Sequence, residues 1–535
     1  MSYLEEFTES QLRLLERFVT NTTSPVFVLQ NLPEVIKGAL FSRYSRSTLG
    51  LRSLLLKEFI LNEDTAFSSL VAGEPAGVAI QKAQQFYDRI LDGYGDDSIG
   101  ELGGAHLAVE SVSMLAAKEI EDCRIGGSPL EKSTRYIYFD QKIDGEYLFY
   151  QEPILMASAY RELFLATCTD LFETYGRLIP PLTAHIEASF PQDPAISKGA
   201  YTAALRAKVL DCLRGLLPAS ALTNLGVFGN GRFFELLVQK MNNHKLAELQ
   251  ALGERAEEEL GKVIPSFIRR AHRSHRHYQG YVQYSEALQQ ALRTVVKKTP
   301  PLPCKESGVR LVHFDANGPA RIASALLFAQ TGSGLQELQD HCSSWGEEQF
   351  EELFQEIALP RTNRRHKSPR ALEHAFFTFE IVADFGIYRD LHRHRMLTQE
   401  RQLLSCRLDS YVPPELLGTP MEAEYKDALE RARQAYETIA QELPEEAQYV
   451  VPMAYNVRWY MNINLRGLQW LCELRSQPAG HPAYRRVAQE LARLVSEAIP
   501  SFRHFFSFVD FSGHPLGRLE QEIRSEQKKS AALSQ

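Results

Sequence analysis

Residues 376–401 read FFTFEIVADFGIYRDLHRHRMLTQER, an apolar run that passes directly into a cluster of arginine and histidine. The apolar run predicts a buried strand, and Asp384 is suited to cap a helix that follows it. On that helix Arg389 and Arg393 are four residues apart and share one face. Guanidinium groups beside imidazoles are suited to bind a phosphate or another oxyanion. The stretch therefore predicts an anion site that begins inside the fold.

A solvated basic helix is the alternative interpretation, because most charge runs lie on exposed helix faces. Two features favour the anion site. The segment follows a strongly apolar strand, and it mixes histidine with arginine, whereas exposed faces usually mix lysine with glutamate. Asp390 and His394 share the next face of the same expected helix.

Length and charge bound the classes of protein that the chain can belong to. Its 535 residues are enough for roughly three domains or two large ones. A net charge of -8 argues against general binding of nucleic acid or of membrane surfaces, so a basic site must be local. The seven cysteines show no CxxC pair or metal-ligand spacing, which predicts no metal site and favours the reducing cytoplasm. The N-terminus lacks the pattern of a signal peptide, and no apolar run is long enough to cross a bilayer.

An internal repeat is indicated by features that recur in the same order. Leu-Leu-Pro218 precedes Asn230-Gly-Arg232, and Val-Val-Pro452 precedes Asn464-Leu-Arg466, with the asparagine twelve positions after the proline both times. Because the residue types, their order and their spacing all agree, the sequence predicts two homologous halves. The expected organisation is an N-terminal helix (1–24), a first half (25–290), a linker (291–304), a second half (305–520) and a polar tail (521–535).

The second half resembles the flavin-dependent thymidylate synthase family, ThyX. That family combines a turn containing His-x-Ser with a downstream Glu, an Arg-His-Arg after a strand and helix, and an Asn-x-Arg on a helix that ends in Leu-Arg. The matching residues here are His366, Ser368, Glu373, Arg393-His394-Arg395, Asn464, Arg466 and Arg475. The second half departs from the family at four places. The family has a Ser-x-Arg-Tyr shortly after Arg-His-Arg, but here Leu403 stands at the position of its serine, and Ser405-Cys-Arg407 follows two residues late. Gln448 replaces an arginine of the family, and Asp390 replaces a glutamine.

The first half resembles the same family in the complementary elements. It keeps Ser98 and Glu101 of the turn, Ser133-Thr-Arg135-Tyr136, Arg214 before Leu-Leu-Pro218, and Asn230-Gly-Arg232. It has Asp122-Cys-Arg124 where Arg-His-Arg would be, Asp96 in place of the turn histidine, and Lys240-Met241 in place of Leu-Arg.

The resemblance implies an α+β fold of two tandem ThyX-like domains, each a small, mostly antiparallel sheet with long helices, and helix-rich overall. In the family the active sites lie between subunits of a homotetramer, and each subunit supplies part of the motif set. Because each half here keeps a different part, we expect the halves to pair and build a composite site. A homodimer of the fused chain would then mimic the family tetramer.

The resemblance also implies the roles of individual residues. Ser133, Arg135, Arg214, Arg393 and Arg475 are expected to bind the nucleotide, with Ser133, Arg393 and Arg475 taking part in catalysis. FAD is expected to contact His366, Ser368, Glu373, His394, Arg395 and Asn464.

The implied reaction is reductive methylation of dUMP to dTMP, with FAD as cofactor and with NAD(P)H and methylenetetrahydrofolate as co-substrates. Arginines are suited to bind a dianionic phosphate because they bind its oxygens in pairs. The flavin carries the hydride, and the protein orients and polarises the reacting groups. The alternative is a catalytically silent relative that keeps a flavin or nucleotide pocket, which Asp390 and the displaced Ser405 favour. An RNA-binding protein is a third and weaker possibility, because the chain is acidic and lacks an aromatic and basic platform.

Overall fold

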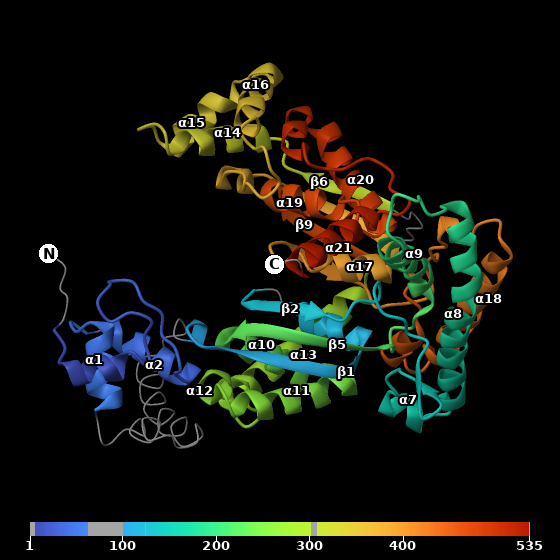
Figure 1. Ribbon diagram of the computed structural model, residues 1–535, viewed down its shortest axis with the longest axis horizontal. Coiled ribbons are helices and arrows are strands. Elements are labelled where there is room, and N and C mark those ends of the chain that lie inside the picture. Colours follow the sequence, from blue (N-terminus) through green and yellow to red (C-terminus); the bar gives the residue numbers. More distant parts are fainter. Residues whose placement is uncertain (1–5, 46, 62–99, 124, 301–307, 534–535) are drawn as a thin grey trace. The chain divides into compact units, whose positions relative to one another are not determined.

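The computed structural model describes residues 6–45, 47–61, 100–123, 125–300 and 308–533 (Figure 1). The chain forms two compact units, each built from separate segments. Unit 1 comprises Met1–Ser111, Glu119–Glu131 and Asn224–Leu302. Unit 2 comprises Val112–Lys118, Lys132–Thr223 and Pro303–Gln535. The units therefore do not coincide with the two halves expected from the sequence, because unit 2 takes a long segment from each half.

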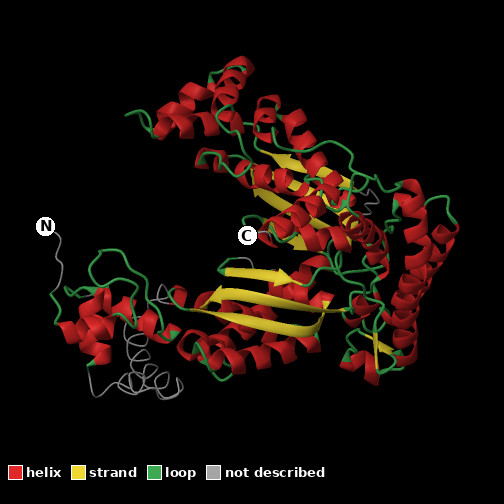
Figure 2. Cartoon of the chain, in the orientation of Figure 1, coloured by secondary structure: helices red, strands yellow, loops and turns green. Residues whose placement is uncertain are grey.

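Unit 1 contains a three-stranded sheet in the order β1-β5-β2, with helices following β5 (Figure 2). β2 and β5 are antiparallel, with Gly127 opposite Gly229. A Cβ atom at either glycine would lie within 2.4 Å of the Phe233 ring, so these positions need glycine for the ring to cover the sheet. The elements are β1 (Gly104–Ser113), β2 (Gly127–Glu131), β5 (Leu222–Asn230), α10 (Gly231–Asn242), α11 (Ala247–Gly261), α12 (Pro265–Ile268) and α13 (Arg276–Val296).

The N-terminal part of unit 1 is less regular than the sequence predicts. The helix expected over residues 1–24 is α1 (Glu9–Leu15), which starts at a capping box formed by Thr8 and Gln11. After this helix, Val19 and Leu29 form a single antiparallel bridge. Next come α2 (Glu34–Tyr44), α3 (Leu51–Leu54) and the π-helix η1 (Leu55–Ile60).

Unit 2 is built on a four-stranded antiparallel sheet in the order β6-β7-β9-β8. The expected strand before the Arg/His stretch is confirmed as β7 (Phe376–Asp384). Its alternate residues Phe377, Phe379 and Ile381 are fully buried, as the two-residue period of a strand with one covered face requires. The other strands are β6 (Gly308–Phe314), β8 (Thr398–Arg401) and β9 (Asn456–Asn464).

Helices make up most of unit 2, and the whole is an α+β protein with small antiparallel sheets, as expected. Many of its helices lie beside the sheet or extend from it in Figure 2. The elements from the first half are α6 (Met114–Glu121, whose last residues belong to unit 1), β3 (Lys142–Ile143), β4 (Glu146–Tyr147), α7 (Pro153–Ala157), α8 (Arg161–Ser189), α9 (Lys198–Leu213) and η3 (Arg214–Leu216). Those from the second half are α14 (Gly318–Phe328), α15 (Leu335–Ser343), α16 (Glu347–Ala358), η5 (Arg370–His374), α17 (Phe385–Leu391), η6 (Pro414–Leu416), α18 (Pro420–Ile439), η7 (Glu446–Val450), α19 (Leu465–Arg475), α20 (Pro482–Ala498), η8 (Pro500–Phe506) and α21 (Leu519–Leu533).

Backbone hydrogen bonds between residues 215–220 and 449–454 form what we call the central ladder of unit 2. Ala219 N donates to Val451 O at 2.9 Å, and Met453 N donates to Leu217 O at 2.9 Å. Pro218 and Pro452 are 234 positions apart (452 minus 218). When the first-half residue number of the first bond is raised by 234 and its second-half residue number is lowered by 234, the second bond results, with the donor now in the second half and the acceptor in the first. The two prolines form the bridge at the centre. Such exchange is the property of two copies paired about a two-fold axis.

A second bond pair of the ladder obeys the same rule. Ser220 N donates to Tyr449 O at 3.1 Å, and Ala454 N donates to Gly215 O at 2.8 Å. The ladder is therefore symmetric over its whole length, which is the arrangement that a duplicated unit would produce by pairing with itself.

The helices that begin beside the ladder start in the same way in both halves. Met114 N donates to Ala221 O at 3.0 Å, and Phe385 N donates to Tyr455 O at 3.0 Å. The preceding residue caps each helix: Ser113 Oγ accepts from Ala116 N, and Asp384 Oδ1 accepts from Ile387 N, both at 2.9 Å. The Asp384 cap was expected from the sequence and is confirmed.

Within the described residues, no helix has both the length and the apolar character needed to cross a bilayer.

Candidate functional site

The Arg/His stretch leaves the helix earlier than the sequence predicts. α17 ends at Leu391, so Arg393 follows the helix instead of sharing its face with Arg389. Arg389 is buried, with Nη1 at 2.9 Å from Met114 Sδ and 2.8 Å from Met453 Sδ. The expectation that Arg389 and Arg393 share one helix face is therefore wrong.

Arginines from both halves converge in unit 2 and form what we call the arginine cluster. Its members are Arg135, Arg214, Arg393 and Arg475. Two carboxylates, Asp211 and Asp390, and the Tyr484 ring join them. All four are among the residues that the family resemblance implied would bind the nucleotide.

Asp390 connects the two halves within the cluster. Its Oδ2 accepts from Arg214 Nη1 at 3.1 Å, and its Oδ1 accepts from Arg393 Nη2 at 2.7 Å. Burial alone would raise the pKa of Asp390, but Arg214, Arg393, Arg475 and Arg135 together hold that pKa well below its usual value. Asp390 is therefore ionised inside the cluster at neutral pH.

Tyr484 makes the second bridge between the halves. Its hydroxyl accepts from Arg135 Nη1 at 3.2 Å, and the Arg475 guanidinium lies over its ring, 5.6 Å from the centroid. Arg135 is fixed further by a two-point contact with Asp211, at 2.6 Å and 2.7 Å, and by Ala479 O. Burial tends to raise the pKa of Asp211, and Arg135 more than offsets this, so the pKa is lowered.

Two histidines beside the cluster are neutral. Arg475 Nε donates to His394 Nε2 at 3.0 Å, so that nitrogen carries no proton. His481 Nδ1 accepts from Ala483 N at 3.1 Å, which leaves the proton on Nε2 to be donated to Asp211 O at 3.1 Å. Burial lowers the pKa of His394 well below its usual value, and burial followed by Arg214 lowers the pKa of His481 to about 3.

The cluster retains capacity for another acceptor. Arg214 is 5% exposed, and among the described residues its Nη2 has no hydrogen-bond partner. The Arg393 side chain is 32% exposed, so the cluster reaches solvent on that side. A buried guanidinium N–H without an acceptor is costly, which favours an oxyanion at this position.

Ser133 is held in the turn that presents Arg135. Its Oγ accepts from Arg135 N at 3.2 Å. Ser405 makes the same local bond with Arg407 N at 3.5 Å, so the displaced Ser405-Cys-Arg407 of the second half keeps the turn. Arg407 is exposed and belongs to no part of the cluster.

The residues implied to contact FAD fall into two groups. Asn464 caps α19 through Oδ1, with Gly467 N as the donor at 2.8 Å, and Arg475 ends that helix beside His394. Arg395 is exposed and directly follows His394 in the chain. The group His366, Ser368 and Glu373 lies along the other flank of α19, apart from the cluster.

That second group is tied to α19 by polar contacts. Ser368 Oγ donates to Gln469 Oε1 at 2.7 Å, and Glu373 Oε1 accepts from Arg466 Nη1 at 2.6 Å. His366 is exposed. A pocket of about 510 Å³ adjoins Glu373, and its other lining residues are Arg321, Ala325, Arg370, Ala371, His374 and Phe376.

The first-half positions that correspond to the Arg/His stretch hold acidic side chains in unit 1. Counting from the matched caps Ser113 and Asp384, Asp390 corresponds to Glu119, and Arg393 corresponds to Asp122. Lys240 Nζ lies 3.5 Å from Glu119 Oε2 and 3.2 Å from Asp122 Oδ2. Cys123 stands where His394 would be, and burial raises the pKa of its thiol to about 11. This set carries no arginine among its described members; Arg124, like Asp96 and Ser98, lies outside the described residues.

Sequence patterns missed Asp211, His481 and Tyr484. Asp211 and Tyr484 contact Arg135, and His481 contacts Asp211, in each case far away along the chain; Tyr484 and Arg135, for example, are 349 positions apart. Asp211 lies three residues before Arg214 on the last turn of α9, which in retrospect is the one local signal.

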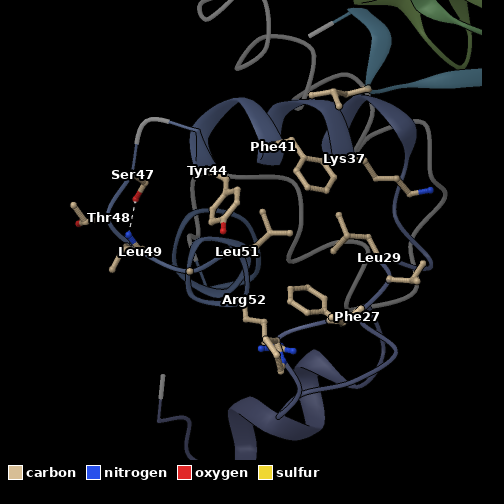
Figure 3. A pocket seen from close by; sticks show the side chains of 15 residues that line it. Phe27, Leu29, Lys37, Phe41, Tyr44, Ser47, Thr48, Leu49, Leu51 and Arg52 are labelled. Carbon is tan, nitrogen blue, oxygen red and sulfur yellow. Dashed lines mark hydrogen bonds between the residues drawn. The ribbon is translucent and has the colours of Figure 1, made fainter. Parts of the chain in front are cut away.

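A larger pocket, of about 1280 Å³, lies in the N-terminal part of unit 1 (Figure 3). Its lining is mostly apolar, with Lys37 and Arg52 as the charged residues. Arg52 is occupied by the carbonyl oxygen of Asn21, at 2.9 Å, and lies over the Phe27 ring. Its described lining residues include no paired acids, bases or nucleophiles, so it is a weaker candidate for chemistry.

Comparison with known proteins gives a family and two groups of relatives. The sequence pattern of the family described as thymidylate synthase complementing protein, Thy1, matches residues 61–266 and 311–501, one segment in each half. A UPF0159 protein of Chlamydia muridarum is 55% identical over 521 residues, which is 97% of this chain and 98% of that protein. A UPF0159 protein of Thermoplasma acidophilum is 31% identical over 92% of this chain and 99% of that protein.

Among solved structures, a UMP/dUMP methylase, PolB from Streptomyces cacaoi, with bound 5-Br dUMP, is 21% identical over 37% of this chain and 94% of that chain. The TM-score of 0.30 is too low for that likeness to indicate a shared fold.

Proposed function

Because the chain belongs to the thymidylate synthase complementing protein family, we propose that it methylates dUMP reductively to dTMP at the arginine cluster. The observation that carries this proposal is the convergence of Arg135 and Arg214 with Arg393 and Arg475 in one unit. The two halves would each supply two arginines to one composite site.

The charge of the cluster suits a phosphate monoester. Four arginines and two ionised aspartates leave these six side chains with a formal charge of +2. A phosphate dianion neutralises that charge, and the unpartnered Arg214 Nη2 offers it a donor. Arginine binds phosphate oxygens through two N–H groups at once, which fixes the nucleotide as well as attracting it.

One such site per chain is part of the proposal. The corresponding first-half positions carry Glu119 and Asp122, whose charge Lys240 compensates within unit 1. Carboxylates repel a phosphate, so those positions would not take a second nucleotide.

The residues implied to bind FAD suit an isoalloxazine with its phosphates. Asn464 uses only Oδ1 as a helix cap, which leaves its amide N–H groups for a cofactor. Neutral His394 and the Arg475 guanidinium lie at the other end of α19, where positive charge would favour a reduced, anionic flavin ring. The pocket beside Glu373 is lined by Arg321 and Arg370, which could bind cofactor phosphates, and by Phe376, which could pack against a cofactor ring. A bound flavin would carry hydride from NAD(P)H, and methylenetetrahydrofolate would supply the carbon.

Two experiments test the proposal. The protein purified under native conditions should show the absorption bands of bound flavin, and its gene should restore growth of a thymidine-requiring strain without thymidine. Growth restored by the wild-type gene, but not by R135Q or R393Q, is the expected result. Absence of flavin together with no dUMP binding would overturn the proposal.

A catalytically silent relative is the second candidate function, and Asp390 is the observation that favours it. Its carboxylate already occupies Arg214 and Arg393, where the family places a neutral glutamine. A silent relative would bind dUMP and FAD but fail to restore growth. In either case we propose a cytoplasmic homodimer, which light scattering would reveal as twice the 60.7 kDa chain mass.

A further inference from the structure

Arg518 is a buried arginine that no family motif includes. It lies 17 positions beyond residue 501, where the family match ends (518 minus 501), and directly before α21. Its side chain is only 6% exposed. The sequence alone gave no reason to select it.

The Arg518 guanidinium has fewer partners than a buried charge requires. Its Nη2 lies 3.4 Å from Glu522 Oε1, which is a long contact. Among the described residues, its Nε and Nη1 have no hydrogen-bond partner. An arginine stays charged at any pH at which the protein folds, so the unmade bonds cannot be relieved by loss of a proton.

Arg518 lies against the loop that presents Arg135. Its guanidinium carbon is 3.8 Å from the centroid of the Tyr136 ring, and Tyr136 follows Arg135 in the chain. A Cβ atom on Gly517 would lie 2.0 Å from Pro478 O, so the backbone before Arg518 packs on the segment whose Ala479 O accepts from Arg135 Nη2. The Tyr136 side chain that covers the guanidinium is itself 48% exposed.

We propose that Arg518 is a further phosphate-binding residue of the composite site, acting beside Tyr136 on the same side as Arg135. Its free N–H groups bind an oxygen of a phosphate, either the monophosphate of dUMP or the pyrophosphate of FAD. This inference rests on the proposed function of the site.

The experiment compares R518Q with two matched variants. R524Q removes an arginine of α21 whose side chain is 73% exposed and paired with Glu520. E522Q removes the ion-pair partner of Arg518 and leaves the guanidinium in place. The dissociation constants of dUMP and of FAD are measured for all three and for the wild type, together with the melting temperature.

R518Q should weaken the binding of dUMP or of FAD by about 10- to 100-fold, the usual effect of losing a hydrogen bond to a charged group. The ligand affected identifies which phosphate Arg518 holds. R524Q should bind both ligands as the wild type does, and E522Q should bind them at least as tightly, because it frees a donor. If R518Q fails to fold, R518K, which keeps the charge but not the Nε–H, should show the loss of affinity instead.

If R518Q binds both ligands as tightly as the wild type does, the inference is overturned. The same outcome for R518K overturns it where R518Q does not fold. In either case, dUMP binding by the wild type leaves the proposed function standing. A loss of affinity in E522Q equal to that in R518Q would also overturn it, because the ion pair would then be the only role. A wild type that binds neither ligand overturns both proposals.

Discussion

At the residue scale, the chemistry of the candidate site depends on carboxylates placed among arginines. Asp390 and Asp211 each satisfy one or two guanidinium groups, and they keep the cluster from being a bare accumulation of positive charge. The remaining positive charge is then the amount that a single phosphate dianion can neutralise. Removal of either carboxylate should therefore change both stability and anion binding.

Asp390→Asn should lower the free energy of unfolding by about 3 kcal/mol, because it leaves Arg214 and Arg393 buried without their anion. Urea denaturation of the wild type and the variant measures the change. Glu490→Gln is the control, because its partner Arg493 is half-exposed and exposed pairs contribute less than about 1 kcal/mol. Equal losses in the two variants would contradict the importance of Asp390.

His481→Asn should reduce the acid sensitivity of the protein. The pKa of His481 is about 3 in the folded state and near 6.5 in the unfolded chain, so the unfolded chain binds the additional proton between those values. Stability contributed by the neutral ring is complete above pH 6.5 and falls by about 1.4 kcal/mol per pH unit below it. Asparagine can still cap α20 but does not titrate.

The measurement for His481 is the free energy of unfolding between pH 7 and pH 4.5. The curve of H481N should be flatter than that of the wild type over this range. Parallel curves would mean that His481 is not held neutral.

Sequence reasoning selected Arg135, Arg214, Arg393 and Arg475, and the structure brings all four together. The selection came from a resemblance to family motifs, each of which spans only a few consecutive residues. Asp211 and Tyr484 escaped it because their partners are contributed by distant segments, and no spacing rule links positions so far apart. The wrong prediction for Arg389 has a local cause, since α17 ends at Leu391, before the arginines could share a face.

At the element scale, capping residues set where the helices of the site begin. Asn230 and Asn464 end equivalent strands, and each accepts a backbone N–H of the helix that follows, at 2.9 Å and 2.8 Å. The sequence predicted a cap of this kind at Asp384, because a cap depends on neighbours three residues away, but it did not predict the caps at Asn230 and Asn464. Helix lengths were predicted less well; α1 covers 9–15 instead of 1–24 because pairing between Val19 and Leu29 ends the helical pattern.

Asn464→Asp and Asn464→Ala separate capping from cofactor binding. The aspartate keeps the capping oxygen and should leave stability nearly unchanged, whereas the alanine should cost about 1 kcal/mol. Both lack the amide N–H groups, so both should lose flavin affinity. The same two changes at Asn230 should alter stability in the same way without affecting flavin. Wild-type flavin affinity in N464D would contradict the role of Asn464.

At the scale of the whole molecule, the central ladder accounts for how one chain could do the work of two subunits. Its paired bonds about Pro218 and Pro452 place segments of both halves in unit 2. The sequence predicted the 234-residue offset, but not that the compact units would interleave the halves, because chain crossing between units leaves no local pattern.

Mixing experiments test whether the site belongs to one chain. R135Q and R393Q should each lack dUMP binding, and a mixture of the two, unfolded and refolded together, should also lack it, because each chain carries one defect in its own cluster. R407Q, altered at the exposed counterpart of Arg135, should bind normally. Recovery of about a quarter of the sites in the mixture, the share expected of random pairing between chains in a dimer, would place the site between chains.

The most direct measurement of the central claim is the number of dUMP molecules bound per chain at saturation, by equilibrium dialysis at several concentrations of nucleotide. The composite site predicts one dUMP per chain, reduced to none by R135Q in the first half and also by R393Q in the second. Two molecules per chain, or one that survives either substitution, would contradict it.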